Sequence, residues 1–394
     1  MSSTRYASDP SDFSAERALA HSSIQGINIG LNVIARVSRA RTVPQTRAMI
    51  WLHNYARLMG LTADQLTRDL ALPTVEIRDA LTNPAADCID RFTTAVANLR
   101  SQYESRLPSL VKNRIFRTVR SGILEAAQDK VFGIIVGPER IGKSEAFLDT
   151  YLREFMDRAI LISCPEGRDM RSFTTELAKA LGIPLSRAKK NEHYREQIST
   201  TFATGAIEAI FIDEVQRIWP SDLERHMPEK IEFLRTLWDQ AELQRRARRG
   251  THDTGGLSII GCATPQFSTD LNTALDSNRR WKPGQFEGRM RRTYTPETLT
   301  ENEVRQIARY MAPDFDAAAI DTVTAVSLAS PGLLGFLGNV IGKVRFLARD
   351  ESRPITPDLI NDAARRMLQG TATERKAREA AAKKAAAEKA ALLK

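Results

Sequence analysis

Cysteine and long apolar runs are the two features that this chain most lacks. Its 394 residues include three cysteines, Cys88, Cys164 and Cys262, which lie far apart and form no C-x-x-C pair. That spacing favours neither a disulfide framework nor a zinc site. No apolar run approaches the roughly 20 residues that a membrane-spanning helix needs, and no apolar signal segment follows Met1 to Arg5. The sequence therefore predicts a cytoplasmic protein with no membrane partner.

Acidic residues are outnumbered, but much of the basic excess lies at one end of the chain. There are 57 Lys and Arg against 48 Asp and Glu, and the formal net charge is +9. Residues 371–394 hold seven Lys or Arg and three Glu, so they supply +4 of that charge. The total charge therefore gives limited support for nucleic-acid binding, and the positions of the basic residues carry more information. A chain of this length is expected to form two or three domains.

A phosphate-binding pattern, G-x-x-x-x-G-K-S, follows an apolar run at 131–136 and precedes a helical pattern at 144–152. In this pattern the backbone N–H groups of the loop face the phosphates, the lysine reaches the β and γ oxygens, and the serine hydroxyl binds Mg²⁺. The helix N-terminus adds to the anion site. The sequence therefore predicts binding of ATP and Mg²⁺. The expected ATP-binding residues are Gly137, Pro138, Glu139, Arg140, Ile141, Gly142, Lys143 and Ser144.

Two adjacent carboxylates, Asp213 and Glu214, close a second apolar run about seventy residues later. A buried strand that ends in such a pair is typical of a nucleotide site at the carboxyl edge of a parallel sheet. Asp213, together with Ser144, is expected to hold Mg²⁺, and Glu214 is expected to polarise the attacking water. The alternative is a helix N-terminus with an acidic cap. The phosphate loop favours the first interpretation, which makes the protein an ATPase.

Residues 1–43 are rich in Ser and Arg and predict a basic flexible arm with one short helix at about 24–34. A plain disordered leader is the alternative. From 44 to 106, apolar residues recur at helical spacing and predict a compact helical domain.

Within that domain, two short helices at 62–70 and 74–81 flank a turn at 71–73, which is the helix-turn-helix arrangement. The second helix is expected to be capped by Thr74 and to enter the major groove of DNA. An ordinary α-hairpin is the alternative, because acidic residues in the second helix would weaken phosphate contacts. The candidate DNA contacts of this helix pair are Arg68, Thr74 and Arg78.

Residues 107–295 alternate between strand and helix patterns and predict an α/β nucleotide-binding domain with a parallel sheet. Helical patterns return at 296–370, and residues 371–394 form an Ala/Lys-rich tail that is expected to be flexible. The strands of the sheet are expected at 131–136, 159–163, 206–212 and 257–261.

The phosphate loop, the Asp-Glu strand end, the later strand, an arginine group and a small helical domain together resemble an AAA+ ATPase with a helical lid. This resemblance implies that Thr264 is the sensor that holds the attacking water, with Cys262 a weaker choice. It also implies that Arg289 is an arginine finger that acts on a neighbouring subunit, a group worth about 10³-fold or more in rate in related sites. Arg291 or Arg292 are the other candidates for this role, and a basic loop facing solvent or DNA is the alternative.

Two positions depart from the family pattern. Arg140 stands where the family loop often has glycine, and the segment 330–336 has no arginine where a second sensor normally lies. The second departure puts nucleotide sensing by the lid in doubt.

Within the AAA+ family, the N-terminal helix-turn-helix, the Asp-Glu-Val-Gln strand end and the Gly-rich lid of residues 46–367 resemble the phage Mu B protein and its TnsC and TniB relatives. This resemblance implies an ATP-dependent assembly of rings or helical filaments on double-stranded DNA that selects target DNA and activates a transposase of the integrase type. A replication initiator or helicase loader with the same core is the alternative.

An assembly on duplex DNA would need basic residues that contact phosphates. Residues near the second predicted strand and after Pro184 are suited to this role, and a solvated surface is the alternative for each cluster. The first choices are Arg168, Arg171, Lys189 and Lys190, with Arg187 and the group Arg245, Arg246, Arg248 and Arg249 as further candidates.

Overall fold

The computed structural model describes residues 29–167, 169–186, 188–223, 226–247, 256–277, 281, 286, 288–330 and 333–368. The chain divides into two compact units. The first consists of Met1–Pro138 and Lys143–Thr295, and the second of Glu139–Gly142 and Pro296–Lys394. The tail at 371–394, most of the N-terminal arm and Arg168, Arg187, Arg248 and Arg249 lie outside the described residues.

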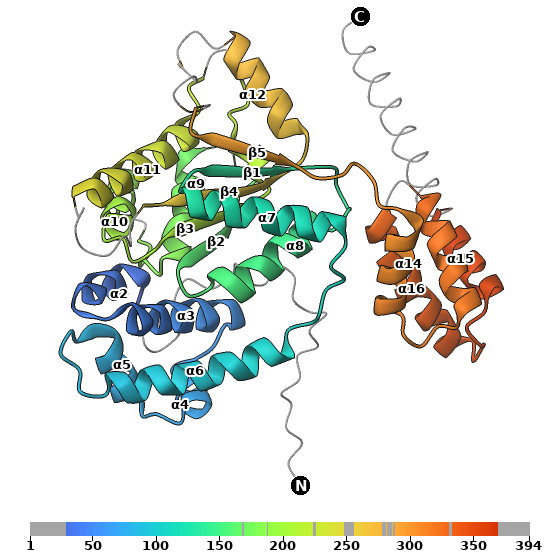
Figure 1. The fold of residues 1–394 in the computed structure, drawn as a ribbon, viewed down its shortest axis with the longest axis horizontal. Coiled ribbons are helices and arrows are strands. Elements are labelled where there is room, and N and C mark those ends of the chain that lie inside the picture. The colour runs from blue at the N-terminus through green and yellow to red at the C-terminus, as the bar shows by residue number, and fades with distance from the viewer. Residues whose placement is uncertain are drawn as a thin grey trace, which may run out of the picture. The chain divides into compact units, whose positions relative to one another are not determined.

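A five-stranded sheet forms the centre of the first unit (Figure 1). The strands lie in the order β2-β3-β4-β1-β5, and every neighbouring pair is parallel. Every residue of β1 and β4 is buried, and because successive side chains point to opposite faces, both faces of these strands are covered. The strands are β1 (Phe132–Val136), β2 (Ala159–Ser163), β3 (Ala209–Asp213), β4 (Ser258–Ala263) and β5 (Met290–Tyr294).

The predicted α/β fold with a parallel sheet is confirmed, and the structure adds a fifth strand that the sequence pattern did not indicate. β5 lies at one edge of the sheet, and its residues are exposed or half-buried because only one neighbouring strand covers it. Helix α7 packs on β1, β4 and β5, whereas α9 packs on β2 and α11 on β4. The helices and helical turns after the N-terminal segment are α7 (Arg114–Asp129), α8 (Lys143–Thr150), η3 (Tyr151–Phe155), α9 (Met170–Ala180), α10 (Asn191–Phe202), η4 (Val215–Ile218), α11 (Glu229–Ala247) and α12 (Gln266–Ser277).

Residues 29–43 differ from the predicted flexible arm. Leu31 and Ile34 are fully buried, and the backbone N–H of Leu31 donates to the carbonyl of Leu181 at 2.7 Å. The basic residues of this stretch had suggested an extended segment, but its apolar residues pack on α10 and α3. The N-terminal elements are α2 (Leu31–Val37), η2 (Ser38–Ala40), α3 (Val43–Met59), α4 (Ala63–Leu70), α5 (Thr74–Thr82) and α6 (Ile89–Arg106).

Helices α4 and α5 form the predicted pair of short helices. The hydroxyl of Thr62 accepts from the N–H of Gln65, and Ala71 ends α4 in a left-handed conformation at a φ of 52°. The expected cap of α5 is wrong, since Pro73 occupies the N-cap position and Thr74 is already helical. The Thr74 hydroxyl instead meets that of Thr67 at 2.9 Å, which links the two helices.

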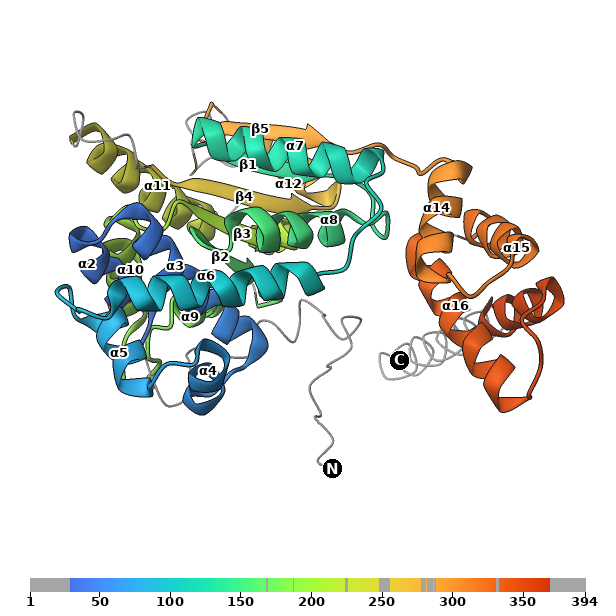
Figure 2. The same ribbon diagram turned by 60° about the horizontal axis from the view of Figure 1, so that its bottom comes forward.

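Helix α3 lies along the open edge of the sheet formed by β2 (Figures 1 and 2). The side-chain amide of Asn54 donates to the carbonyls of Met156 and Ala159, each at 2.8 Å. The guanidinium of Arg57 donates to the carbonyl of Leu161 at 3.1 Å. Asn54 and Arg57 are almost fully buried. An edge strand leaves backbone groups unpaired, and these two side chains satisfy carbonyls of β2 or of the turn before it, so the helical segment completes the sheet.

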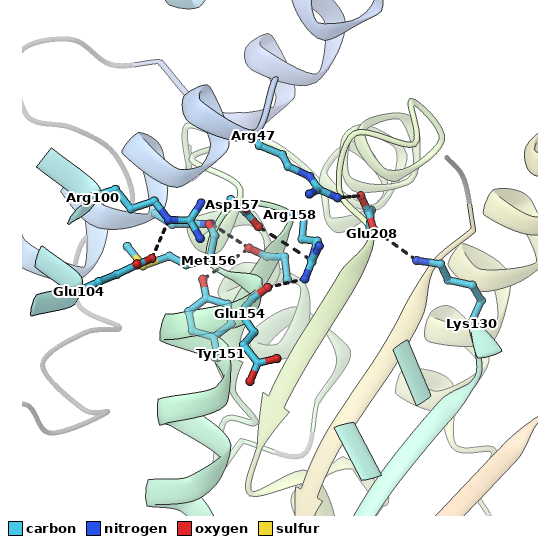
Figure 3. Close-up of polar contacts among 12 residues, drawn as sticks. Arg47, Arg100, Glu104, Lys130, Tyr151, Glu154, Met156, Asp157, Arg158 and Glu208 are labelled. Carbon is cyan, nitrogen blue, oxygen red and sulfur yellow. Dashed lines mark hydrogen bonds and ion pairs between the residues drawn. The ribbon is translucent and has the colours of Figure 1, made fainter. Parts of the chain in front are cut away.

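Ion pairs also join the N-terminal helices α3 and α6 to segments that lead into strands of the sheet (Figure 3). The carboxylate of Glu208, just before β3, lies 3.5 Å from both Arg47 of α3 and Lys130 at the end of α7. Arg100 of α6 contacts Asp157 at 2.9 Å, in the turn that leads into β2. Both contacts lie at the amino-terminal ends of β2 and β3, where they hold α3 and α6 against the sheet.

The stability of the fold is expected to depend on pH through His53, a fully buried residue of α3. Burial, with a contribution from the Arg57 cation, lowers the pKa of His53 from 6.5 to about 3. The unfolded chain therefore binds a proton below pH 6.5 while the folded chain does not, so the free energy of unfolding falls by about 1.4 kcal/mol per pH unit below 6.5. Chemical denaturation at pH 7 and pH 5 measures this fall.

The variant His53→Leu should lose most of that pH dependence. The same change at partly exposed His193 should leave the dependence as in the parent protein. Equal slopes for His53→Leu and the parent protein between pH 7 and 5 would contradict this account of the buried imidazole.

The second unit contains α14 (Glu301–Met311), α15 (Ala317–Leu328), α16 (Leu333–Asp350) and a further helical stretch at 357–368. Thr300 caps α14 by accepting from the N–H of Glu303, whose carboxylate in turn accepts from the N–H of Thr300. The helical character expected for this part of the chain is therefore present in its described residues. Among the helices of the described residues, none combines the length and the apolar character needed to cross a membrane.

Candidate nucleotide site

The phosphate loop joins the carboxyl end of β1 to the first turn of α8. The N–H of Gly137 donates to the carbonyl of Ala263 at 3.2 Å, which ties the start of the loop to the end of β4. A side chain at Gly137 would collide with Oγ1 of Thr295, so this position requires glycine. Gly142 has a φ of 90°, a backbone conformation that residues with a side chain rarely adopt. The two glycines of the motif are therefore both explained by local backbone geometry.

Arg140 shows why the family often has glycine at its position. Its φ is 60°, in the left-handed region. A residue with a Cβ occupies that region at a cost of about 1–2 kcal/mol relative to the right-handed one. The loop carries this cost while retaining Gly137 and Gly142.

Lys143 and Ser144 begin α8 and lie beside the loop. Lys143 is only 6% exposed, and its ammonium donates to the carbonyl of Pro138. The hydroxyl of Ser144 donates to Oδ1 of Asp213 at 3.4 Å. A buried ammonium at a helix N-terminus, where backbone N–H groups also lack helical partners, favours a bound anion.

Asp213 is the last residue of β3, and Glu214 follows it. Both lie at the carboxyl ends of the strands, where the phosphate loop also begins. The N–H of Glu214 donates to Oδ1 of Asp213 at 2.9 Å, and Glu214 has a left-handed φ of 55°. Burial raises the pKa of Asp213, and the neighbouring Glu214 carboxylate adds to this effect. A bound cation would offset both causes, because it favours the charged form of the carboxylate.

The donor set fits Mg²⁺ bound together with phosphates. No group of three or more His, Cys, Asp and Glu side chains in the described part of the chain is arranged to hold a metal. Mg²⁺ commonly takes one or two protein oxygens and completes its shell with phosphate oxygens and water. The Ser144 hydroxyl and the Asp213 carboxylate, which already lie within hydrogen-bond distance, can supply these oxygens.

A residue without a role in the sequence interpretation, Gln216, links the other two predicted catalytic groups. Its side-chain amide donates to Oε2 of Glu214 at 2.7 Å, and its amide oxygen accepts from the N–H of Thr264 at 3.3 Å. Thr264 directly follows β4, as the sensor assignment expects, whereas Cys262 lies inside that strand and is buried. The only signal in the sequence was an amide two residues after Glu214.

Arg289 lies near the amino-terminal end of β1, whereas the phosphate loop follows the carboxyl end of that strand. Its carbonyl accepts from the N–H of Phe132, the first residue of β1, at 3.1 Å, whereas the loop follows the last residue of that strand. Its guanidinium contacts Asp239 at 3.2 Å and lies 5.1 Å from the centre of the Trp238 ring. Strand β1 separates Arg289 from its own loop by about 16 Å at the usual rise per residue.

The other finger candidates lie on β5 itself. Arg291 forms ion pairs with Asp129 at 2.7 Å and Glu125 at 3.5 Å, both near the end of α7. Arg292 is half-buried. In the register of the two strands Arg291 stands beside Gly133 and Arg292 beside Ile134, so all three arginines lie toward the start of β1, and the choice of Arg289 stays a prediction.

The predicted DNA contacts do not form one group in space. Arg68 and Arg78 are exposed on α4 and α5. Arg171 lies in the first turn of α9, whereas Lys189 and Lys190 lie in the segment that follows the other end of this helix. This segment returns along the helix, because the Thr174 hydroxyl of α9 contacts both the carbonyl of Arg171 and the side chain of Asn191, which directly follows Lys190, so these basic residues lie in the same part of the unit.

The basic cluster at the end of α11 is partly neutralised. Arg245 and Arg246 both pair with Glu242, at 2.7 and 2.8 Å. These two arginines lower the pKa of Glu242 to about 2. Glu242 therefore offsets part of the positive charge of Arg245 and Arg246.

Together, the loop, the Lys143 ammonium and the β3 carboxylates have the arrangement expected of a P-loop nucleotide site. The sequence profile of a family described as AAA domain matches residues 126–269, which contain the loop, β3 and β4. The fold is accordingly the AAA+ type of P-loop fold, and this stretch is an AAA domain. No curated protein sequence matches the chain.

Several solved structures are similar to this chain in shape. Cdc6p from Pyrobaculum aerophilum is 12% identical with a TM-score of 0.48, over 66% of this chain and 68% of that chain. Domain III of the replication initiation protein DnaA from Thermotoga maritima is 15% identical with a TM-score of 0.41, over 65% and 92%. The RuvB Holliday junction branch migration motor of Thermotoga maritima is 14% identical with a TM-score of 0.37, over 64% and 68%.

Proposed function

We propose that this protein is an ATP-hydrolysing AAA+ ATPase that assembles on double-stranded DNA and regulates transposition. In this role it selects target DNA and activates a transposase of the integrase type. ATP at the interface between subunits stabilises the assembly, and hydrolysis releases it. The branch of the family follows from the resemblance of residues 46–367 to the phage Mu B, TnsC and TniB proteins.

One observation carries the ATPase part of this proposal. Lys143 and Ser144 at the start of α8 lie beside Asp213 at the end of β3, and Glu214 follows Asp213 directly. These groups supply a cation for the phosphates, two oxygens for Mg²⁺ and a carboxylate for the attacking water. Gln216 contacts both the Glu214 carboxylate and the backbone N–H of Thr264, which adds two polar residues to this group.

The position of Arg289 supports an assembly rather than an isolated subunit. A guanidinium that neutralises the γ-phosphate in the transition state must touch that phosphate. Arg289 lies near the amino-terminal end of β1, away from the phosphate loop of its own subunit. It can serve as a finger only in a neighbouring copy. Hydrolysis should then require association of subunits in rings or helical filaments.

DNA binding is supported by the α4–α5 pair and by exposed basic residues. Arg68 and Arg78 are exposed, and Val75 of α5 is 77% exposed, so this face has both charged and apolar contacts to offer to a groove. Arg171 and the pair Lys189 and Lys190 lie in one part of the AAA domain, where Thr174 contacts both the Arg171 carbonyl and Asn191. We assign them to backbone contacts with DNA that passes along an assembly of several subunits.

The test of this proposal combines the full chain, duplex DNA and nucleotide. Sedimentation and electron microscopy should show DNA-bound oligomers with a non-hydrolysable ATP analogue and far fewer with ADP, and duplex DNA should raise the ATPase rate. Material that stays monomeric with both ligands present would refute the assembly. Association of these oligomers with a replicative helicase, and not with an integrase-type transposase, would instead assign the protein to the replication initiators and helicase loaders.

A further inference from the structure

The amide of Gln216 connects two parts of the nucleotide site that belong to different strands. Its nitrogen donates to the Glu214 carboxylate after β3, at 2.7 Å. Its oxygen accepts from the N–H of Thr264 after β4, at 3.3 Å. One side chain thus ties the carboxylate assigned to the attacking water to the backbone of the assigned sensor residue.

The side-chain amide of Gln216 supplies both the donor and the acceptor that the two contacts need. A carboxylate acceptor requires a donor, and a backbone N–H requires an acceptor, so the nitrogen of Gln216 must face Glu214 and the oxygen must face Thr264. The reversed amide would place two acceptors together and two donors together. Glutamate would keep the second contact and lose the first, whereas an apolar side chain would lose both.

The backbone that carries Gln216 is held firmly. The neighbouring residues Val215 and Ile218 of η4 are buried at 2% and 3% exposure. A Cβ added at Gly261 of β4 would lie 2.8 Å from a methyl group of Val215, so this glycine lets the turn approach the strand closely. The turn therefore holds the amide at a fixed place between the ends of β3 and β4.

A competing partner shows what the Gln216 contact prevents. Arg217 lies 3.7 Å from the same Oε2 of Glu214, and it also contacts Glu166 at 3.8 Å. A carboxylate released by Gln216 is drawn toward this cation, whose other carboxylate partner, Glu166, has an 88% exposed side chain. Charge attraction of this kind would turn Glu214 away from the position that the short amide contact defines.

We propose that Gln216 is a positioning residue that orients Glu214 for hydrolysis and couples this orientation to the sensor end of β4. The inference rests on the proposed ATPase activity and deepens it. Gln216 touches neither phosphate nor metal in this role, and it acts through the carboxylate of Glu214. Its loss should therefore slow hydrolysis and leave nucleotide binding intact.

The experiment compares Gln216→Met and Gln216→Glu in the full chain. Steady-state ATPase assays with duplex DNA give kcat and KM, and titration with a fluorescent ATP analogue gives Kd. We expect kcat to fall about 10- to 100-fold in Gln216→Met, with KM and Kd within about twofold of the parent values, as for a lost hydrogen bond to a charged group. Gln197→Met, at an amide that contacts His193 on α10, is the matched control and should keep the parent kcat.

Gln216→Glu separates positioning from a merely structural role. It retains the acceptor for the Thr264 N–H but places a second carboxylate against Glu214. A structural role predicts recovery of kcat in this variant, whereas the positioning role predicts a kcat at or below that of Gln216→Met. Recovery in Gln216→Glu, or a parent-like kcat in Gln216→Met, would overturn the inference.

A double-mutant cycle with Glu214→Gln tests whether Gln216 acts through the carboxylate. If it does, adding Gln216→Met to Glu214→Gln lowers kcat no further, because the group that Gln216 orients is already lost. An additive loss overturns the inference and leaves the proposed function standing. A Glu214→Gln protein that hydrolyses ATP at the parent rate removes the basis of both.

Discussion

Replacing Lys143 by alanine is expected to weaken ATP binding by at least about 100-fold, equivalent to about 2.7 kcal/mol. The lysine ammonium is buried beside the loop and has the Pro138 carbonyl as a neutral partner. A triphosphate would replace that carbonyl by anionic oxygens and gain charge-assisted hydrogen bonds. Titration of a fluorescent ATP analogue into the variant measures the loss, and sedimentation with duplex DNA should show no ATP-dependent oligomers.

Lys179→Ala is the matched control for this change. Lys179 lies on α9 and pairs with Glu176 at 2.7 Å, so its removal alters the charge by the same amount away from the loop. The control should bind the analogue like the parent protein. Parent-like affinity in Lys143→Ala would show that the loop does not hold the phosphates in the way that its sequence motif predicts.

The nucleotide site was predictable because its signals are local. The motif at 137–144 is recognised by its two glycines and its lysine, and Asp213 and Glu214 close a short apolar run that predicts a buried strand. Both segments occur where parallel strands end, so their proximity follows from the fold class. The Ser144–Asp213 contact confirms that these two segments meet.

Other features escaped the sequence because they depend on partners distant in the chain. β5 carries arginines at positions 291 and 292 and looked like a loop, but an edge strand tolerates charged side chains because part of it stays in water. His53, Asn54 and Arg57 look like surface residues of a helix, yet all three are buried, and Asn54 and Arg57 donate to carbonyls of β2 or of the turn before it. Helical spacing alone could not show which face of α3 would meet a strand.

The relation of the helix pair to the AAA domain also required the structure. The sequence indicates α4 and α5 through the cap at Thr62 and the turn at 71–73. It does not indicate that α3 and α6, which flank the pair, are tied to β2 and to the turn before it by Arg57 and Arg100. The helices on either side of the pair are therefore anchored at the edge of the sheet.

Glu214→Gln is expected to separate ATP binding from hydrolysis. Loss of a group that activates water lowers kcat by about 10²- to 10⁴-fold, whereas the phosphate contacts of Lys143 and the Ser144–Asp213 pair remain. The substitution keeps the size of the side chain, so the affinity for ATP should stay within a few-fold of the parent value. Rapid-quench assays of a single turnover and analogue titration measure these two quantities.

The same variant should remain on DNA in the presence of ATP. If hydrolysis releases the assembly, oligomers of Glu214→Gln formed with ATP will dissociate as slowly as parent oligomers formed with a non-hydrolysable analogue. Glu166→Gln is the matched control, because Glu166 also contacts Arg217 but has an 88% exposed side chain. Dissociation of Glu214→Gln oligomers at the parent rate with ATP would mean that release does not depend on the water-activating carboxylate, and the proposed switch would be wrong.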